Sequence, residues 1–100
     1  MSQTVQLSTP ITAHNEEVSE LTFREPTTKD TIEIGLPTLI IISEGETGVE
    51  VRQKVVAKYI SKLCSIPKSS VESLSLKDFS ACTKVVMGFF GEGDKEKTES

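Results

Sequence analysis

Hydrophobic and polar residues alternate along the first part of the chain, which is typical of β-strands with one buried face. One side of the first strand carries Val5, Leu7, Thr9 and Ile11. Pro10 falls on the other side, where a residue without an N–H suits an edge strand. The alternation returns in a second segment, with Leu21 and Phe23 on one side. The pattern predicts a β-hairpin with strands over residues 4–13 and 16–24.

Short polar segments mark the ends of these first elements. Asn15, and less readily His14, tolerates a positive φ, so the two residues predict the tight turn of the hairpin. After the hairpin, Thr27 and Asp30 have the spacing of a capping box, which predicts the start of a helix. This helix must be short, because glycine and proline at residues 35–37 end it.

The segment over residues 39–51 allows two interpretations. Runs rich in β-branched residues flank a glycine-containing loop at residues 44–48, which favours a second short hairpin. Alternatively, the isoleucines at residues 40–42 pack irregularly in the core.

A helical pattern is clearest over residues 52–64. Its apolar residues form two rows, with Val55, Tyr59 and Leu63 in one and Val56, Ile60 and Cys64 in the next. Lysines occupy the other face. The pattern predicts an amphipathic helix that buries both rows.

Two further helices are predicted in the last third of the chain. Ser69 and Glu72 have capping-box spacing and predict a short helix through Leu74. Ser75 then caps the last helix, with Asp78 three positions further on. The apolar stripe of the last helix comprises Leu76, Phe79, Cys82, Val86 and either Phe89 or Phe90.

These elements together predict an α+β fold. An amino-terminal β-hairpin, with the possible second hairpin near residues 39–51, packs on a small carboxy-terminal helical half of about three helices. Gly91 ends the last helix, and no apolar residue follows it. We therefore expect a single domain over residues 1–91 and a disordered, charged tail over residues 92–100.

Composition narrows the range of partners. The chain has 100 residues, no tryptophan and a net charge of −4. An acidic chain with scattered lysines lacks the basic patch that nucleic-acid binding requires. The amino terminus does not resemble a signal peptide, and the longest apolar run, residues 39–42, is far too short to cross a bilayer. We expect no nucleic acid and no membrane partner, but a domain of this size favours association with another protein or with itself.

The sequence offers no catalytic arrangement, and we expect no enzyme, cofactor or metal. The single histidine, His14, lies at the predicted turn, and zinc requires three or four ligands at suitable spacing. No glycine-rich loop follows a strand to bind phosphate. Cys64 and Cys82 have no histidine nearby to activate them, so two reduced, buried thiols are expected.

Several short motifs occur in a specific order along the chain. They are Leu21-Thr22, residues 24–27, Tyr59-Ile60, Ile66-Pro67, residues 69–71, Leu74, Asp78-Phe79 and residues 88–91. In this order and spacing, the chain resembles the small tail assembly proteins of Mu-like and related tailed bacteriophages and prophages. The resemblance spans about residues 5–91, is loose over residues 36–52, and lacks the glycine that usually follows Asn or Asp in the hairpin turn.

The resemblance implies a phage tail assembly chaperone, made in the cytoplasm of the bacterial host and absent from the finished virion. Such a protein binds the tape measure protein, a long helical chain with exposed apolar surface, and keeps it soluble until the tail tube polymerises around it. The family often makes a second, longer product by ribosomal frameshifting. Two alternatives are a minor structural or adaptor protein of the tail and an acidic inhibitor of a host protein.

The end of the last helix carries the candidate partner-binding residues, which are Val86, Met87, Phe89 and Phe90. Apolar residues at helical spacing near an exposed edge can anchor a partner helix, and phenylalanine and methionine bring large and adaptable apolar area. Phe89 and Phe90 lie about 100° apart on a helix, so one can face inward and the other outward. The alternative is that one of them closes the core.

Overall fold

The computed structural model describes residues 3–43 and 45–91, so the tail predicted at residues 92–100 lies outside the described residues. Within them, two strands are followed by a helix, two more strands and three helices. The strands form two separate antiparallel sheets of two strands each. The predicted α+β class is confirmed.

The amino-terminal hairpin forms where the alternation predicts it. Strand β1 (Gln3–Ala13) pairs antiparallel with β2 (Glu16–Phe23). His14 and Asn15 form the two-residue loop, with φ of 54° and 64°, which confirms the predicted tight turn. The side chains that this hairpin buries are Ile11, Ala13, Leu21 and Phe23.

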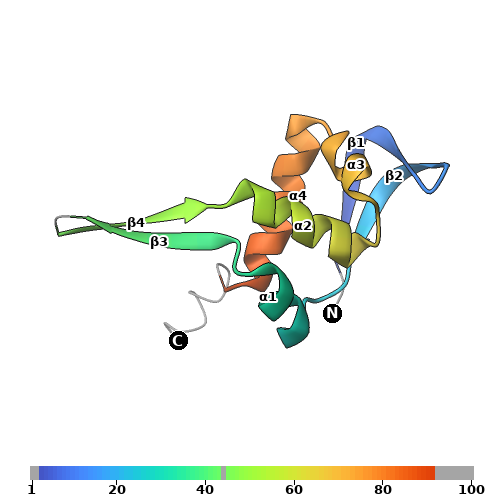
Figure 1. Ribbon diagram of the computed structural model, residues 1–100. Coiled ribbons are helices and arrows are strands. Elements are labelled where there is room, and N and C mark those ends of the chain that lie inside the picture. Colours follow the sequence, from blue (N-terminus) through green and yellow to red (C-terminus); the bar gives the residue numbers. More distant parts are fainter. Residues whose placement is uncertain (1–2, 44, 92–100) are drawn as a thin grey trace, which may run out of the picture.

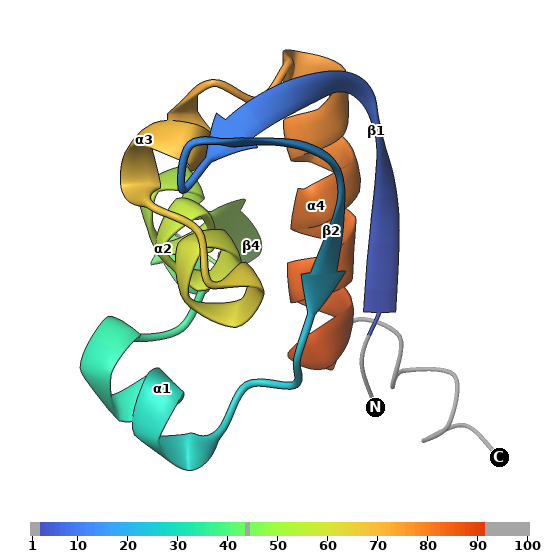
Figure 2. The same cartoon turned by 90° about the vertical axis from the view of Figure 1, so that its right-hand side faces the viewer.

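Four helices lie within the described residues: α1 (Thr28–Ile34), α2 (Gln53–Cys64), α3 (Lys68–Glu72) and α4 (Leu76–Phe89). Helix α2 packs on β2 and α4 packs on β1, while α3 contacts both α2 and β1 (Figure 2). Both apolar rows of α2 are buried as predicted, apart from Cys64, which is half-buried. The core therefore lies between one face of the hairpin and the helices.

Two helix starts have the predicted caps. The Thr27 hydroxyl accepts from the Asp30 N–H at 3.3 Å, and the Asp30 carboxylate accepts from the Thr27 N–H at 2.9 Å, so the capping box is complete. Ser75 accepts from the Asp78 N–H at the start of α4. Gly35, with φ of 96°, ends α1.

Two details of the helical half differ from the prediction. The capping box of Ser69 with Glu72 is wrong, because α3 begins at Lys68 with Pro67 at its N-cap, which has no side-chain capping bond. Leu76 was expected on the apolar stripe of α4 but is 81% exposed. The first turn of this helix has no described element packed over Leu76, so periodicity alone placed it in the core.

Strand β1 departs from strict alternation. The pairing register shifts between Gln6 and Ile11, where several residues of β1 face Ser19 alone on β2. Figure 2 shows β1 bending in this part of its course beside α4. Thr9 is consequently exposed, and the single buried face expected for this strand is wrong at that position.

The second hairpin is also formed. Strands β3 (Thr38–Ser43) and β4 (Glu46–Val51) pair antiparallel, residue for residue, from Thr38 opposite Val51 to Ser43 opposite Glu46. Figure 1 shows this hairpin projecting from the rest of the molecule, and we call residues 38–51 the arm. The molecule is correspondingly elongated, with extents of 49 × 30 × 27 Å.

Candidate partner-binding surface

The four predicted partner-binding residues divide into two pairs. Val86 is fully buried and Met87 is 8% exposed, so both belong to the core of the free protein. Phe89 and Phe90 are half-buried and pack against that core. The expected division into one inward and one outward phenyl ring is not seen, because both rings share their area between core and surface. Partner binding by these residues stays a prediction, and only Phe89 and Phe90 have a substantial accessible area for it.

Tyr59 links this end of α4 to the end of α1. Its ring lies edge-on to the Phe90 ring, with centroids 4.9 Å apart and an interplanar angle of 61°. Its hydroxyl donates to the Gly35 carbonyl, at the end of α1. Burial raises the pKa of Tyr59, so the hydroxyl keeps its proton and remains a donor. The sequence showed Tyr59 as one more core position and gave no signal of this bridging contact.

The base of the arm exposes further apolar side chains near this link. Leu36, directly after Gly35, is 52% exposed, and Val51, the last residue of β4, is 40% exposed. The Arg52 N–H donates to the Pro37 carbonyl at 2.7 Å, which holds the two ends of the arm together. We call Leu36, Val51, Phe89 and Phe90 the root surface. Sequence reasoning did not single out Leu36 or Val51, because neither belongs to a helical apolar stripe.

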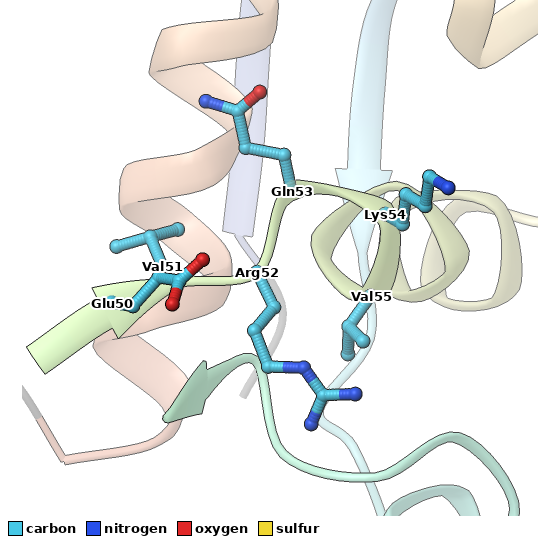
Figure 3. A pocket seen from close by; sticks show the side chains of 6 residues that line it. All are labelled: Glu50, Val51, Arg52, Gln53, Lys54 and Val55. Carbon is cyan, nitrogen blue, oxygen red and sulfur yellow. The ribbon is translucent and has the colours of Figure 1, made fainter. Parts of the chain in front are cut away.

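A shallow hollow lies at the junction of β4 with α2 and is lined by residues 50–55 (Figure 3). Arg52 extends from the junction and donates to the Leu36 carbonyl at 3.4 Å, whereas Gln53 points the other way. Glu50, Arg52 and Lys54 give the hollow charges of both signs. Scattered charges around an apolar Val51 suit the rim of a protein contact better than a reaction centre.

Asp30 and Asp78 are buried carboxylates, and the contacts of both stabilise the fold. The Arg24 guanidinium donates to the Asp30 carboxylate, with a nitrogen-to-oxygen distance of 2.8 Å. This bond, together with the bond from the Thr27 N–H, holds the pKa of Asp30 well below its ordinary value. Asp78 accepts from the Ser8 N–H at 2.9 Å and from the Thr9 N–H at 3.2 Å. The Ser8 bond is the main reason that the pKa of Asp78 is lowered. Carboxylates fixed in the charged form cannot act as general acids near neutral pH.

The remaining reactive groups are inert or structural. Cys64 and Cys82 are free thiols, and burial raises their pKa to about 12 and about 11. A His14 ring nitrogen lies 3.0 Å from the Ser65 carbonyl oxygen and so ties the hairpin turn to the end of α2. No cluster of three or more potential metal ligands occurs among the described residues. In the same part of the chain, no helix combines the length and apolarity needed to span a bilayer.

Comparison with known protein families shows which family this chain belongs to. The family described as phage tail assembly chaperone proteins, E, or 41 or 14, matches residues 4–91. The chain belongs to this phage tail assembly chaperone family. No curated protein and no solved structure matches the chaperone.

The motifs that carried the resemblance hold the chaperone together. Arg24 and Thr27, from the motif that follows β2, both bond Asp30. Ser70 donates to the Thr12 carbonyl of β1 at 2.6 Å, and Asp78 secures the irregular part of the same strand. These contacts join elements that are distant in sequence. These motif residues therefore stabilise the fold of this chain, whereas Leu36 and Val51 of the root surface lie outside the motifs.

Proposed function

We propose that the chaperone binds the tape measure protein during tail morphogenesis and keeps it soluble in the cytoplasm of the bacterial host. The observation that carries this function is the family match over residues 4–91, which covers both hairpins and all four described helices. On this proposal the chaperone is absent from the finished virion. A longer frameshifted product and association with further copies of itself are additional predictions from the resemblance.

The root surface is the site that we assign to the tape measure protein. Its exposed apolar area suits the apolar face of a helical partner. Val86 and Met87 are buried, so their role on this proposal is to anchor the last turns of α4, which carry Phe89, in the core. Burying the exposed half of a leucine contributes about 1 kcal/mol, so several such contacts together produce a modest but useful affinity.

Co-expression with the tape measure protein of the same phage tests function and surface together. Leu36→Asp should leave the melting temperature nearly unchanged, because the side chain is 52% exposed, and should weaken binding about fivefold or more. Leu76→Asp is the matched control, since Leu76 is 81% exposed at the other end of α4. Phe90→Asp is less informative, because Phe90 also contacts Tyr59 and its loss would lower stability and binding together.

The proposed function and the proposed binding site would fail with different experimental results. If the wild-type chaperone leaves the tape measure protein insoluble, the function is wrong. If Leu76→Asp weakens binding as much as Leu36→Asp, the function stands and the root surface is the wrong site. Mass analysis of purified virions addresses the minor tail protein, since detection of the chain there at stoichiometric amounts would favour that alternative.

A further inference from the structure

Both outer edges of the arm lack a strand partner among the described residues. Among the described residues its sheet consists of β3 and β4 alone, so each strand is paired on one side only. A two-stranded hairpin by itself is marginally stable in water. A row of unpaired N–H and C=O groups is also a template for one more strand. The arm therefore gains stability if another strand joins it.

The two edges differ in how well they are protected against pairing. Strand β3 reads TLIIIS and contains no charge, no proline and no glycine. Strand β4 reads ETGVEV, so it contains the exposed, negatively charged Glu50, and Gly48 weakens it. The register between the strands is continuous, without a bulge that would turn β3 away. Natural edge strands normally carry at least one of these protections, and β3 carries none.

We propose that β3 pairs with β3 of a second copy of this chain. A two-fold axis perpendicular to the strand makes β3 antiparallel to its own copy, so the two arms form a four-stranded sheet with β4 at each outer edge. Pairing through β3 would give the self-association predicted with the proposed function a defined surface. It does not depend on tape measure binding.

Charge decides between the two edges. The chain is acidic, with a net charge of −4, so self-association must avoid bringing its glutamates together. In the sheet paired through β3, the two β4 strands lie three strand spacings apart, about 14 Å. This distance exceeds the Debye length of about 8 Å in physiological salt, so the Glu50 charges of the two copies are largely screened from each other. Pairing through β4 would instead place Glu50 of the two copies on adjacent strands, which are about 5 Å apart.

The register identifies the backbone groups that would make the new bonds. Ser43 and Glu46 flank a two-residue loop, so they form a hydrogen-bonded pair of the ladder. Because such pairs alternate along an antiparallel ladder, the N–H groups of Ile40 and Ile42 are directed to the outer edge of β3. A single pair of six-residue strands is much smaller than the standard interface of about 1,600 Å². We therefore expect a weak dimer, with a dissociation constant of about micromolar order.

Sedimentation of the full chain across a series of concentrations tests the pairing, with matched proline variants. Wild type should shift from the 10.9 kDa monomer towards twice that mass as concentration rises. Ile40→Pro removes an outward N–H from β3 and should raise the dissociation constant by at least about tenfold, since a two-fold dimer loses the bond twice. Val49→Pro is the control, because Val49 is the register partner of Ile40 and its outward N–H lies on the β4 edge. It should leave the dissociation constant within about threefold of wild type.

A second matched pair keeps the test valid if proline unfolds the arm. Ile42→Lys places a charge on the β3 edge and should abolish the dimer, whereas Thr47→Lys, at its register partner on β4, should preserve it. A monomeric wild type at every concentration overturns the pairing, as does equal weakening by both members of each pair. A wild type that stays monomeric alone but captures an extended segment of the tape measure protein through β3 would also overturn it. Failure of the tape measure solubility assay with a concentration-dependent dimer intact would count against the proposed function alone.

Discussion

The chain contains two hairpins that are built by the same local rules and used differently. Both close with a two-residue loop, between Ala13 and Glu16 in one and between Ser43 and Glu46 in the other. The first lies against α2 and α4 and buries four side chains, including Phe23, which is fully buried. The arm stands away from the helices (Figure 1). Turn chemistry thus suffices to make a hairpin, but only packing makes it part of the core.

The polar contacts of the two hairpins differ in the same way. In the irregular part of β1, the Ser8 N–H donates to the Asp78 carboxylate. Near the end of β1, the Thr12 carbonyl accepts from the Ser70 hydroxyl. In the turn that follows, a His14 ring nitrogen lies beside the Ser65 carbonyl at the end of α2. The arm is joined to the body at its base, where Arg52 contacts Pro37 and Leu36. We expect the first hairpin to unfold with the body and the arm to unfold almost independently.

The largest expected contrast is in global stability. Phe23→Ala should lower the free energy of unfolding by about 3–5 kcal/mol, because the ring is fully buried. Replacing residues 39–50 by Asn-Gly shortens the arm to a turn between the register partners Thr38 and Val51, and should change that free energy by less than about 1 kcal/mol. Urea unfolding followed by circular dichroism, at concentrations below dimer formation, measures both. An equal loss in the two variants would show that the arm belongs to the same cooperative unit.

A smaller effect is expected in acid, and it should come from the body alone. The pKa of Asp30 is lowered mainly by Arg24, and that of Asp78 mainly by the Ser8 N–H. These carboxylates therefore contribute stability that is present above the unfolded pKa of about 4 and is lost as pH falls through the lower folded values.

The double variant Asp30→Asn, Asp78→Asn should be less stable than wild type at neutral pH, and its urea midpoint should decline less below about pH 4. Glu50→Gln in the arm is the control and should follow the wild-type pH profile. An unchanged acid slope in the double variant would show that other carboxylates govern the acid transition.

The smallest effect concerns the thiols. Because burial raises the pKa of Cys64 and Cys82, both should react slowly with an aromatic disulfide reagent in the native protein. Replacing both by alanine should cost about 1–2 kcal/mol, since only small groups are removed. Gly48→Cys adds a thiol to the arm, where a Cβ meets no atom within 4 Å, and this thiol should react at the rate of a free one. Rapid reaction of the native thiols, or loss of tape measure binding in a folded alanine variant, would contradict their assignment as inert.

Local features of this protein followed from the sequence. The positive φ tolerated by Asn15, the capping box of Thr27 with Asp30 and the apolar rows of α2 all appear as predicted. Each of these features depends on residues within a few positions of one another, so the local sequence is sufficient to predict it. The second hairpin was one of two open interpretations of residues 39–51, because an apolar run alone does not distinguish a strand from irregular core.

The tertiary structure decided what is buried and what is presented. Periodicity placed Leu76 in the core, but no described element covers it, while Met87, a candidate for the exposed edge only, lies inside. The root surface arises because Tyr59 brings the end of α4 beside the end of α1, a contact between residues far apart in the chain. Likewise, Asp78 was read as a helix-cap residue, and only the bend in β1 supplied the two N–H groups that its carboxylate binds. Burial of a side chain depends on contacts with segments that are distant in the sequence, and these contacts cannot be deduced from the neighbouring residues alone.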